Sequence, residues 1–325
     1  MRLRPKVQAL PRQAELTDDS IVDVAAAALV RTDGRVLIMR RLPGTPMAGQ
    51  WEFPGGKFET GEEAPAALTR ELFEELGVIP IRTRPLIRIR HDYPERSVRL
   101  DCARVDHWEG EVFAHEGHPL AWVAPDELTT YEMLAADRPI VAALRLPTHY
   151  AVTADASTDA LLDGVARLLT AGDTFIQFRA PSLGARYADA AAAAIALCRA
   201  RGATLILNGD PALARALDAD GVHLNAARLR ALSTRPLPAN RWVGASCHDA
   251  EALAHARAIG CDFAVVGPVA PTASHPGATP LGWDAFAALA DCAGLPVYAI
   301  GGLRRSDATT AWAYHGQGVA GISKW

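Results

Sequence analysis

The sequence lacks an excess of positive charge, a closely spaced cysteine pair and a long hydrophobic run. Its 33 Lys and Arg residues are outnumbered by 37 Asp and Glu residues, which argues against a general nucleic-acid-binding surface. Its five cysteines form no CxxC pair, so we expect reduced, mostly buried thiols in a cytoplasmic protein. Residues 1–19 are polar and partly basic, which predicts a disordered tail and neither a signal peptide nor a membrane span.

The length of 325 residues predicts two domains, and the sequence pattern changes near Pro147. Before that proline, residues 20–147 alternate strand-like runs with one acidic helical segment, which predicts a mixed sheet with few helices. The expected strands are 22–30, 36–41, 86–91 and 98–105, and a closing helix is expected over 139–145. Pro147 then breaks the chain.

Residues 148–325 show a different pattern, in which short apolar strands alternate with alanine-rich helices. The expected strands are 150–153, 175–178, 204–207, 221–224, 242–245, 263–266, 297–300 and 319–322. Eight such steps predict a (β/α)₈ TIM barrel, so the whole chain is expected to be of the α/β class. The sequence stops right after the eighth strand, so we expect the last helix to be missing and an apolar groove to lie between the first and seventh helices. Trp325, or a second subunit in a homodimer, would cover that groove.

An acidic segment, RELFEELG, occupies residues 70–77 of the first domain. In a helix, Glu71, Glu74 and Glu75 share one face, because positions i, i+3 and i+4 are neighbours. The opposite face carries leucines 68, 72 and 76, as expected for a helix that packs on a core. Pro65 suits the first turn of this helix, and Gly77 suits the residue just past its end. Three adjacent carboxylates repel one another, and a hard divalent cation such as Mg²⁺ offsets that repulsion. A solvated acidic surface is the alternative interpretation of this segment taken alone.

The residues upstream favour the metal site. From residue 56 the sequence reads Gly-x5-Glu-x7-Arg-Glu-Leu-x-Glu-Glu-x-Gly-Val, which resembles the signature of the Nudix hydrolases at every defined position. The resemblance implies an α/β/α sandwich and a Mg²⁺-dependent pyrophosphohydrolase, with Mn²⁺ as an alternative ion. Glu71, Glu74 and Glu75 would supply metal oxygens. Arg70 can hold a neighbouring glutamate through forked hydrogen bonds.

Further segments are WEFPGGK at 51–57, DYPER at 92–96 and WEGE at 108–111. They resemble the MutT-like branch of the Nudix hydrolases, which acts on oxidised nucleoside triphosphates. The resemblance implies 8-oxo-dGTP as the substrate, and the negative net charge also favours a free nucleotide over a polymer. Gly55 and Gly56 let the backbone approach phosphates. The substrate-binding residues expected are Arg41, Phe53, Gly55, Gly56, Arg96 and Asp137.

Two acidic residues outside the signature extend this prediction. Glu116 stands where the MutT-like branch has an additional metal ligand or base, and a plain loop carboxylate is the alternative. Asp137 stands where that branch has an asparagine that reads the purine edge, so an acceptor is kept and a donor is lost. This acid could accept a hydrogen bond from N7–H of an 8-oxopurine and, when protonated, donate one to O6. A helix N-cap or an exposed acid is the alternative for Asp137.

Seven fragments of the second domain fall, in order, at the expected carboxyl ends of strands, where barrel active sites are built. They are QFR at 177–179, Asn208, DGVHL at 220–224, GASCH at 244–248, VGP at 266–268, TAS at 272–274 and AIGG at 299–302. They resemble the thiamine phosphate synthase family and its thiazole tautomerase relatives. His248 matches the tautomerase histidine, which suits proton transfer, and a structural histidine is the alternative. The phosphate-binding residues implied are Gln177, Arg179, Asn208, Thr272, Ser274, Gly301, Gly302 and Ser323.

The sequence departs from the synthase pattern at its charged positions. Gly209 and Arg228 stand where the family has aspartates for Mg²⁺, and Pro181 and His275 stand where it has lysines. These losses remove most of what would neutralise a pyrophosphate leaving group. We therefore expect the barrel to bind thiazole phosphate or thiamine phosphate with weak or no synthase activity.

Three hypotheses follow from the sequence. In the first, a nucleotide-sanitising Nudix hydrolase carries a degenerate barrel that binds a ligand. In the second, both domains are active enzymes, and the barrel makes thiamine phosphate or tautomerises thiazole phosphate. In the third, the barrel serves mainly as a dimerisation platform. The intact phosphate cradle favours ligand binding over a purely structural role.

Overall fold

The computed structural model describes residues 21–94, 96–272, 277 and 279–322. The predicted tail at 1–19 and the predicted site residues Ser274 and Ser323 lie outside the described residues, as does Trp325. Within the described ranges, none of the helices has the length and hydrophobicity that a bilayer span requires. All five cysteines are free, and four of them are buried.

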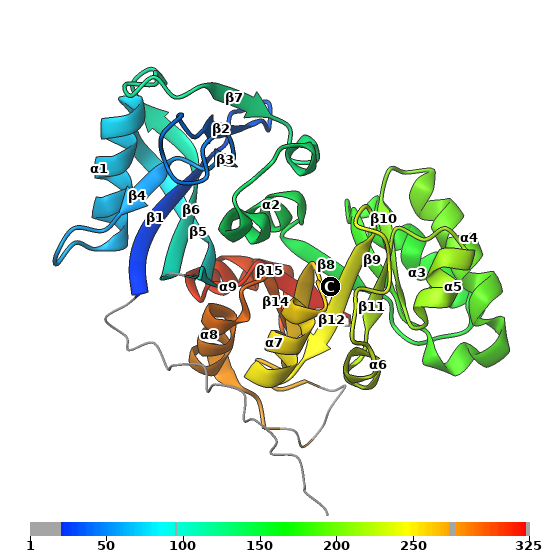
Figure 1. Ribbon diagram of the computed structural model, residues 1–325. Helices are drawn as coiled ribbons and strands as arrows, with labels where there is room; N and C mark the ends of the chain where they lie inside the picture. Colours follow the sequence, from blue (N-terminus) through cyan, green and yellow to red (C-terminus); the bar gives the residue numbers. More distant parts are fainter. Residues whose placement is uncertain (1–20, 95, 273–276, 278, 323–325) are drawn as a thin grey trace, which may run out of the picture.

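The N-terminal part consists of two sheets between two helices (Figure 1). The larger sheet has the order β4-β1-β6-β5, and the smaller has the order β3-β2-β7. The strands are β1 (Ile21–Leu29), β2 (Val36–Arg40), β3 (Trp51–Glu52), β4 (Gly55–Lys57), β5 (Ile79–Asp92), β6 (Ser97–Glu109) and β7 (Leu120–Val123). The helices are α1 (Ala64–Leu76) and α2 (Arg138–Arg145), with short 3₁₀ turns at Glu127–Thr130 and Ala135–Asp137. This arrangement confirms the predicted α/β/α sandwich.

β1 is the central strand of the sandwich. Ala25, Ala27 and Leu29 pack with α1, whereas Ala26 and Ala28 pack in the core that contains α2. A strand covered on both faces is apolar throughout, which explains the run of alanines. The small side chains also allow both layers to approach the strand closely.

α1 begins and ends where the sequence predicts. Proline occupies the first turn, and Gly77 follows the helix in the left-handed conformation with φ 69°. The N–H of Gly77 bonds to carbonyls of the last turn, which satisfies groups that would otherwise be unpaired. The buried side of the helix consists of Ala67 and three leucines, so the glutamates face outward from the core.

β5 is much longer than the predicted strand 86–91. Its first half contains Pro80 and Pro85, which hid it in the sequence. β5 lies at the edge of its sheet, where a residue without an N–H is tolerated. The ladder with β6 is irregular next to both prolines.

The C-terminal part is a closed barrel of eight parallel strands in the order β10-β11-β12-β13-β14-β15-β8-β9, as predicted. The strands are β8 (His149–Val152), β9 (Phe175–Phe178), β10 (Thr204–Asn208), β11 (Gly221–Leu224), β12 (Trp242–Cys247), β13 (Phe263–Val266), β14 (Val297–Ile300) and β15 (Gly318–Gly321). The helices are α3 (Thr158–Thr170), α4 (Tyr187–Arg199), α5 (Pro211–Ala216), α6 (Ala226–Ala231), α7 (Ala250–Ala258), α8 (Gly282–Ala293) and α9 (Ala308–Ala313). No helix follows β15 within the described residues, which end at residue 322.

The sandwich covers one side of the barrel. β5 packs against α8 and α9, and the Arg84 guanidinium lies 4.3 Å from the ring centroid of Trp312. Arg88 contacts Asp101 at 2.6 Å and Asp291 of α8 at 3.3 Å. The sandwich therefore packs against α9, which is one wall of the groove expected beside the missing helix.

α2 connects the two parts through a buried junction. Figure 1 shows α2 between the sheets and the barrel strands, and the proposed domain boundary at residue 147 lies between α2 and β8. Leu146 packs inside the barrel with Tyr150, Phe175 and Tyr298. Gln317, which is buried, donates from Nε2 to the Ala143 and Leu146 carbonyl oxygens at 3.0 and 2.9 Å. The barrel thus supplies the hydrogen-bond donor for the carbonyl groups at the carboxyl end of α2.

We predict that Gln317→Leu destabilises the protein. The leucine fills a similar volume but leaves two buried carbonyl groups without a donor, which costs on the order of 1–3 kcal/mol. We expect a drop of several degrees in the Tm measured by differential scanning calorimetry. Asn240→Leu, at an exposed loop position, is the control and should leave Tm nearly unchanged. Equal Tm values for Gln317→Leu and wild type would contradict this account of the junction.

Candidate functional sites

The glycines of β4 bring backbone against the carboxylates of α1. β4 pairs with β1 so closely that a Cβ on Gly55 would lie 2.1 Å from the Ala25 carbonyl oxygen. A Cβ on Gly56 would lie 2.3 Å from the Glu71 carboxylate. Only glycine fits at position 55, where the neighbour is backbone, whereas a side chain at position 56 would displace the end of Glu71. This close approach lets the Gly55 N–H donate to Glu75 Oε2 at 2.9 Å.

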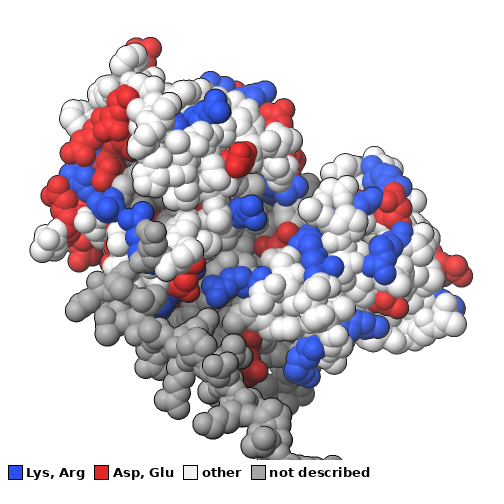
Figure 2. All heavy atoms as spheres, in the orientation of Figure 1, with Lys and Arg blue, Asp and Glu red and all other residues white. Residues whose placement is uncertain are grey.

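Arg70 gathers the acidic residues around the start of the site. Its guanidinium contacts Glu62 at 2.9 Å, Glu71 at 2.8 Å and Glu74 at 3.1 Å. It also donates to the Lys57 carbonyl oxygen at 2.9 Å, so the helix is tied to the end of β4. Hydrogen bonds to Glu62 and Glu71 raise the pKa of Arg70 above its ordinary value. Figure 2 shows acidic side chains gathered over α1.

Glu75 is the most perturbed of these carboxyl groups. Burial raises its pKa to about 8, and the neighbouring charges of Glu71, Glu52 and Glu116 act in the same direction. The hydrogen bond from Gly55 partly opposes the shift. Three other carboxyl groups therefore act on Glu75, and the neutral Gly55 N–H opposes them.

The predicted metal set of Glu71, Glu74, Glu75 and Glu116 is not assembled within the described residues. No three acidic, histidine or cysteine side chains there are grouped closely enough to hold an ion. Glu74 is 56% exposed beside Arg70, and Glu116 is 62% exposed with His118 at 3.3 Å. Like-charge repulsion and the pull of Arg70 explain the spread of the carboxylates. The donors are nonetheless all carboxylate oxygens, which are the ligands that Mg²⁺ prefers, and Glu75 lacks a compensating cation.

Asp137 is buried at the other end of the sandwich site. Its side chain is 4% exposed, and its Oδ2 accepts a hydrogen bond from the Phe53 N–H at 3.2 Å. Burial raises its pKa to about 8, reinforced by Glu52, whereas the Phe53 N–H and Arg41 lower it. Asp137 occupies the N-cap position of α2, as one alternative had it, but its side chain forms no capping hydrogen bond, and burial excludes the exposed acid.

The other predicted substrate-binding residues of the sandwich occupy three different environments. Phe53 is buried in the core beside Asp137. Arg41 forms an ion pair with Glu52 and donates to the Pro46 carbonyl oxygen at 2.7 Å. Arg96 is exposed. Of these three residues, the structure places Phe53 and Arg41 near the buried acid.

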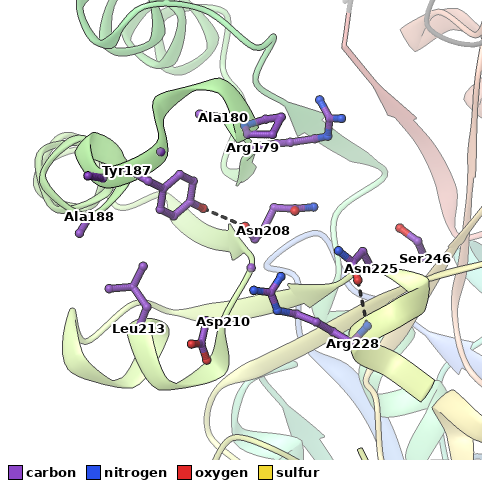
Figure 3. A pocket seen from close by; sticks show the side chains of 14 residues that line it. Arg179, Ala180, Tyr187, Ala188, Asn208, Asp210, Leu213, Asn225, Arg228 and Ser246 are labelled. Carbon is purple, nitrogen blue, oxygen red and sulfur yellow. Dashed lines mark hydrogen bonds between the residues drawn. The ribbon is translucent and has the colours of Figure 1, made fainter. Parts of the chain in front are cut away.

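A cavity of about 580 Å³ opens at the carboxyl ends of the barrel strands (Figure 3). Arg179 and Asn208, both predicted site residues, line it together with Arg228, Asn225 and Ser246. Figure 3 shows the Arg228 side chain extending into the space next to Asn208, with Arg179 on the other side of that amide. The Asp210 carboxylate accepts a hydrogen bond from the Ala212 N–H at 2.8 Å and so caps α5.

A chain of buried hydrogen bonds runs beneath this cavity. Asn208 Nδ2 donates to Gln177 Oε1 at 2.9 Å, and Gln177 Nε2 donates to the Tyr150 hydroxyl at 3.1 Å. The hydroxyl lies 3.3 Å from His223 Nδ1, and His223 Nε2 lies 2.9 Å from Ser246 Oγ. Burial lowers the pKa of His223 to about 3, so the imidazole is neutral. Gln177 is thus below the cavity and acts through Asn208.

The remaining predicted barrel residues do not line this cavity. Gly301 and Gly302 follow β14 with φ of 101° and 71°, and a Cβ on either would clash with the backbone near residues 268–271. Thr272 is close to that segment in sequence. His248 is exposed, and its Nδ1 lies 3.3 Å from the Gly267 carbonyl oxygen. The predicted phosphate-binding set is therefore divided between two places on the barrel rim.

Comparison with known proteins decides the family of each part. Residues 25–143 match the family described as NUDIX domain, and residues 149–325 match the family described as thiamine monophosphate synthase. The protein belongs to both families. Its Nudix domain is 32% identical over 124 residues to the 8-oxo-dGTP diphosphatase of Escherichia coli, covering 38% of this chain and 96% of that protein.

Each domain is also similar to one further curated protein. The Nudix domain is 35% identical over 117 residues to the CTP pyrophosphohydrolase of Escherichia coli, covering 36% of this chain and 87% of that protein. The barrel is 35% identical over 185 residues to the thiamine-phosphate synthase of Thioalkalivibrio sulfidiphilus, covering 55% of this chain and 87% of that protein. The N-terminal half is thus a Nudix pyrophosphohydrolase domain, and the C-terminal half is a synthase-like barrel.

Glu52 and Ser246 are site residues that sequence reasoning did not single out. Glu52 lies between Trp51 and Phe53, which both pack in one core, so strand alternation turns it to the other face. Burial raises its pKa, and Arg41 acts against that shift. The alternation was the available signal for Glu52. Ser246 lay within a matched motif, but its contact with His223 depends on the barrel register.

We predict that Glu75→Gln stabilises the Nudix domain when divalent metal is absent. The amide still accepts from the Gly55 N–H, but it carries no charge beside the other carboxylates. At pH 9 in chelator-treated buffer, Tm should rise by about 2–4 °C over wild type. Added Mg²⁺ should raise the Tm of wild type more than that of the variant. Glu63→Gln, at an exposed position before α1, is the control, and a Tm for Glu75→Gln below that of wild type in both buffers would contradict the prediction.

Proposed function

We propose that the Nudix domain hydrolyses 8-oxo-dGTP to the nucleoside monophosphate and pyrophosphate. The observation that carries this proposal is Asp137, which is buried, held by the Phe53 N–H and left with one oxygen for a base. A buried group that pairs with a feature of one base discriminates strongly, because the wrong base leaves polar atoms unpaired. The similarity to bacterial 8-oxo-dGTP diphosphatases supports the same substrate.

The residues around α1 suit the phosphate chemistry. Glu71 and Glu75, with help from Glu74 and Glu116, are the residues that would hold Mg²⁺. Bound Mg²⁺ would neutralise phosphate charge and make a coordinated water more acidic. Gly55 lets β4 lie against β1, Gly56 leaves room for the Glu71 carboxylate, and Arg70 keeps Glu71 in place. In the hydrolysis, a water oxygen would form a bond to phosphorus while the phosphoanhydride bond between the nucleoside monophosphate and pyrophosphate breaks, and the water would supply the hydroxyl group of one product and a proton to the other.

The protonation state of Asp137 sets which base edge it can read. As a carboxylate it accepts N–H groups, including N7–H of an 8-oxopurine and the amino group of cytosine. As a neutral acid it can donate to O6, which dGTP and 8-oxo-dGTP share. The titratable groups that act on it or are acted on by it are Glu52, Arg41, Tyr93 and Cys102. CTP is therefore a second candidate substrate, supported by the likeness to a CTP pyrophosphohydrolase.

We predict that base discrimination increases with pH. The pKa of Asp137 is about 8, so the acid is mostly neutral at pH 6.5 and mostly ionised at pH 9. The ratio of kcat/KM for 8-oxo-dGTP to that for dGTP should rise about tenfold over this range, and kcat/KM for CTP should rise too. Asp137→Asn cannot ionise and should show a flat ratio. Equal kcat/KM for all three nucleotides at both pH values would move the substrate to another class of nucleoside diphosphate derivative.

We further propose that the barrel binds thiazole phosphate or thiamine phosphate without efficient coupling to the pyrimidine pyrophosphate. Gly301 and Gly302 support phosphate binding, since their backbone conformation is one that glycine adopts readily. Gly209 and Arg228 support the loss of coupling, because neither can replace a metal-binding carboxylate. A barrel that is an active thiamine phosphate synthase or thiazole tautomerase is the alternative, and it would make the protein bifunctional.

The corresponding prediction is that the full-length protein with Mg²⁺ forms thiamine phosphate at least about a thousandfold more slowly than the Gly209→Asp, Arg228→Asp double variant. A Cβ on Gly209 meets no atom within 4 Å, so the aspartate has space, although φ of 158° at this position strains a residue with a side chain. Calorimetry with thiazole phosphate should show binding by both proteins. Rapid thiamine phosphate formation by wild type would show that the barrel is an active synthase.

A further inference from the structure

The barrel cavity contains positive charge that the described protein residues do not neutralise. Arg179 and Arg228 line it, and neither side chain forms an ion pair or hydrogen bond with any residue in the described ranges. By contrast, Arg235 nearby in sequence contacts Asp262 and several carbonyl oxygens. Among the described residues, Asp210 is the only acidic one that lines the cavity, and its carboxylate caps α5. The cavity is therefore suited to an anion.

The buried hydrogen-bond chain adds a donor of fixed direction to this cavity. Because Gln177 Nε2 donates to the Tyr150 oxygen, the single Tyr150 proton is directed to His223 Nδ1. His223 is neutral, so its one remaining proton lies on Nε2 and is donated to Ser246 Oγ. The Ser246 hydroxyl proton is then left to face the cavity, where it can bond to an acceptor. At the other end, Asn208 Oδ1 remains as an acceptor.

The same cavity does not fit the Mg²⁺ ion that the synthase family implies. Gly209 offers no side-chain ligand, and Arg228 would repel a cation. Asp210 alone is a single carboxylate that already accepts a backbone N–H. The donors and charges present are those of an anion site, in which a fixed guanidinium takes the place of an ion.

We propose that this cavity binds a diphosphate group without a metal ion, through Arg179 and Arg228 and with Ser246 as an additional donor. Two separated guanidinium groups match the two phosphoryl groups of a diphosphate better than a single phosphate, because each can form charge-assisted hydrogen bonds. This inference deepens the proposed function, because pyrophosphate is also what the proposed Nudix reaction releases. The cavity can thus take up the product of the first domain or the diphosphate end of an organic ester.

Calorimetric titration of the full-length protein with inorganic pyrophosphate tests the proposal. In metal-free buffer we expect saturable 1:1 binding, with affinity that excess Mg²⁺ does not increase. Arg228→Ala and Arg179→Ala should each weaken binding at least about tenfold, and Ser246→Ala should weaken it about threefold to tenfold. Arg230→Ala is the matched control, because Arg230 lies on the same helix, is exposed and does not line the cavity. Arg228→Lys keeps the positive charge but loses the paired N–H donors of the guanidinium, so its affinity for pyrophosphate should be intermediate.

Titrations with different phosphate ligands distinguish the two possible sources of the diphosphate and show which results contradict the proposal. Orthophosphate should bind at least about tenfold more weakly than pyrophosphate, since it cannot span both arginines. Tighter binding of the pyrimidine pyrophosphate than of inorganic pyrophosphate supports an ester ligand, and the reverse supports uptake of the Nudix product. Binding that needs Mg²⁺, or that survives Arg228→Ala unchanged, overturns the proposal. Nucleotide hydrolysis measured on Arg228→Ala should equal wild type, so failure of this inference and failure of the Nudix assignment are distinguishable.

Discussion

The hydrogen bond from Gly55 to Glu75 joins the central sheet to α1, and the arrangement of the Nudix domain follows from it. For that bond to form, β4 must lie close against β1, which requires glycine at position 55, and Gly56 leaves room for the Glu71 carboxylate of α1. The side chains of β1 must in turn be small enough for both faces of the strand to be covered, and its alanines meet that requirement. One face then carries α1 with its carboxylates, and the other carries α2, which leads into the barrel. A single close backbone contact thus sets both the acidic site and the position of the second domain.

The two sites of this chain have opposite charge. Around Glu75, the charges of neighbouring carboxylates act on a buried side chain that has one neutral donor, which suits a cation. In the barrel cavity, Arg179 and Arg228 have no acceptor among the described residues, which suits an anion. The synthase fold ordinarily unites the two kinds of charge through a metal ion, whereas here Arg228 takes the position of a ligand. Under the two proposals above, the same chain would hold phosphate groups with a metal ion in one domain and without one in the other.

Motifs that depend on local spacing could be predicted from the sequence. The limits of α1, the role of Arg70 as the partner of glutamates and the eight barrel strands all rest on contacts within a few residues or on repeated patterns. β5 was underestimated because Pro80 and Pro85 are allowed only by its place at the sheet edge, which the sequence does not state. The spread of the metal carboxylates depends on side-chain electrostatics without an ion. The hydrogen-bond chain from Asn208 to Ser246 includes residues of five strands, so it depends on the register of the closed barrel.

The contacts of Gln317 have a consequence for how the protein is made. This side chain completes the hydrogen bonds at the end of α2 across 174 and 171 residues of sequence. During synthesis, the Nudix domain emerges from the ribosome long before the residue that closes its last helix. Until β15 joins the barrel, the Ala143 and Leu146 carbonyl groups must stay hydrated and Leu146 has no barrel interior to enter. The Nudix domain therefore gains its last helix-terminal hydrogen bonds only when the barrel segment that contains Gln317 is in place.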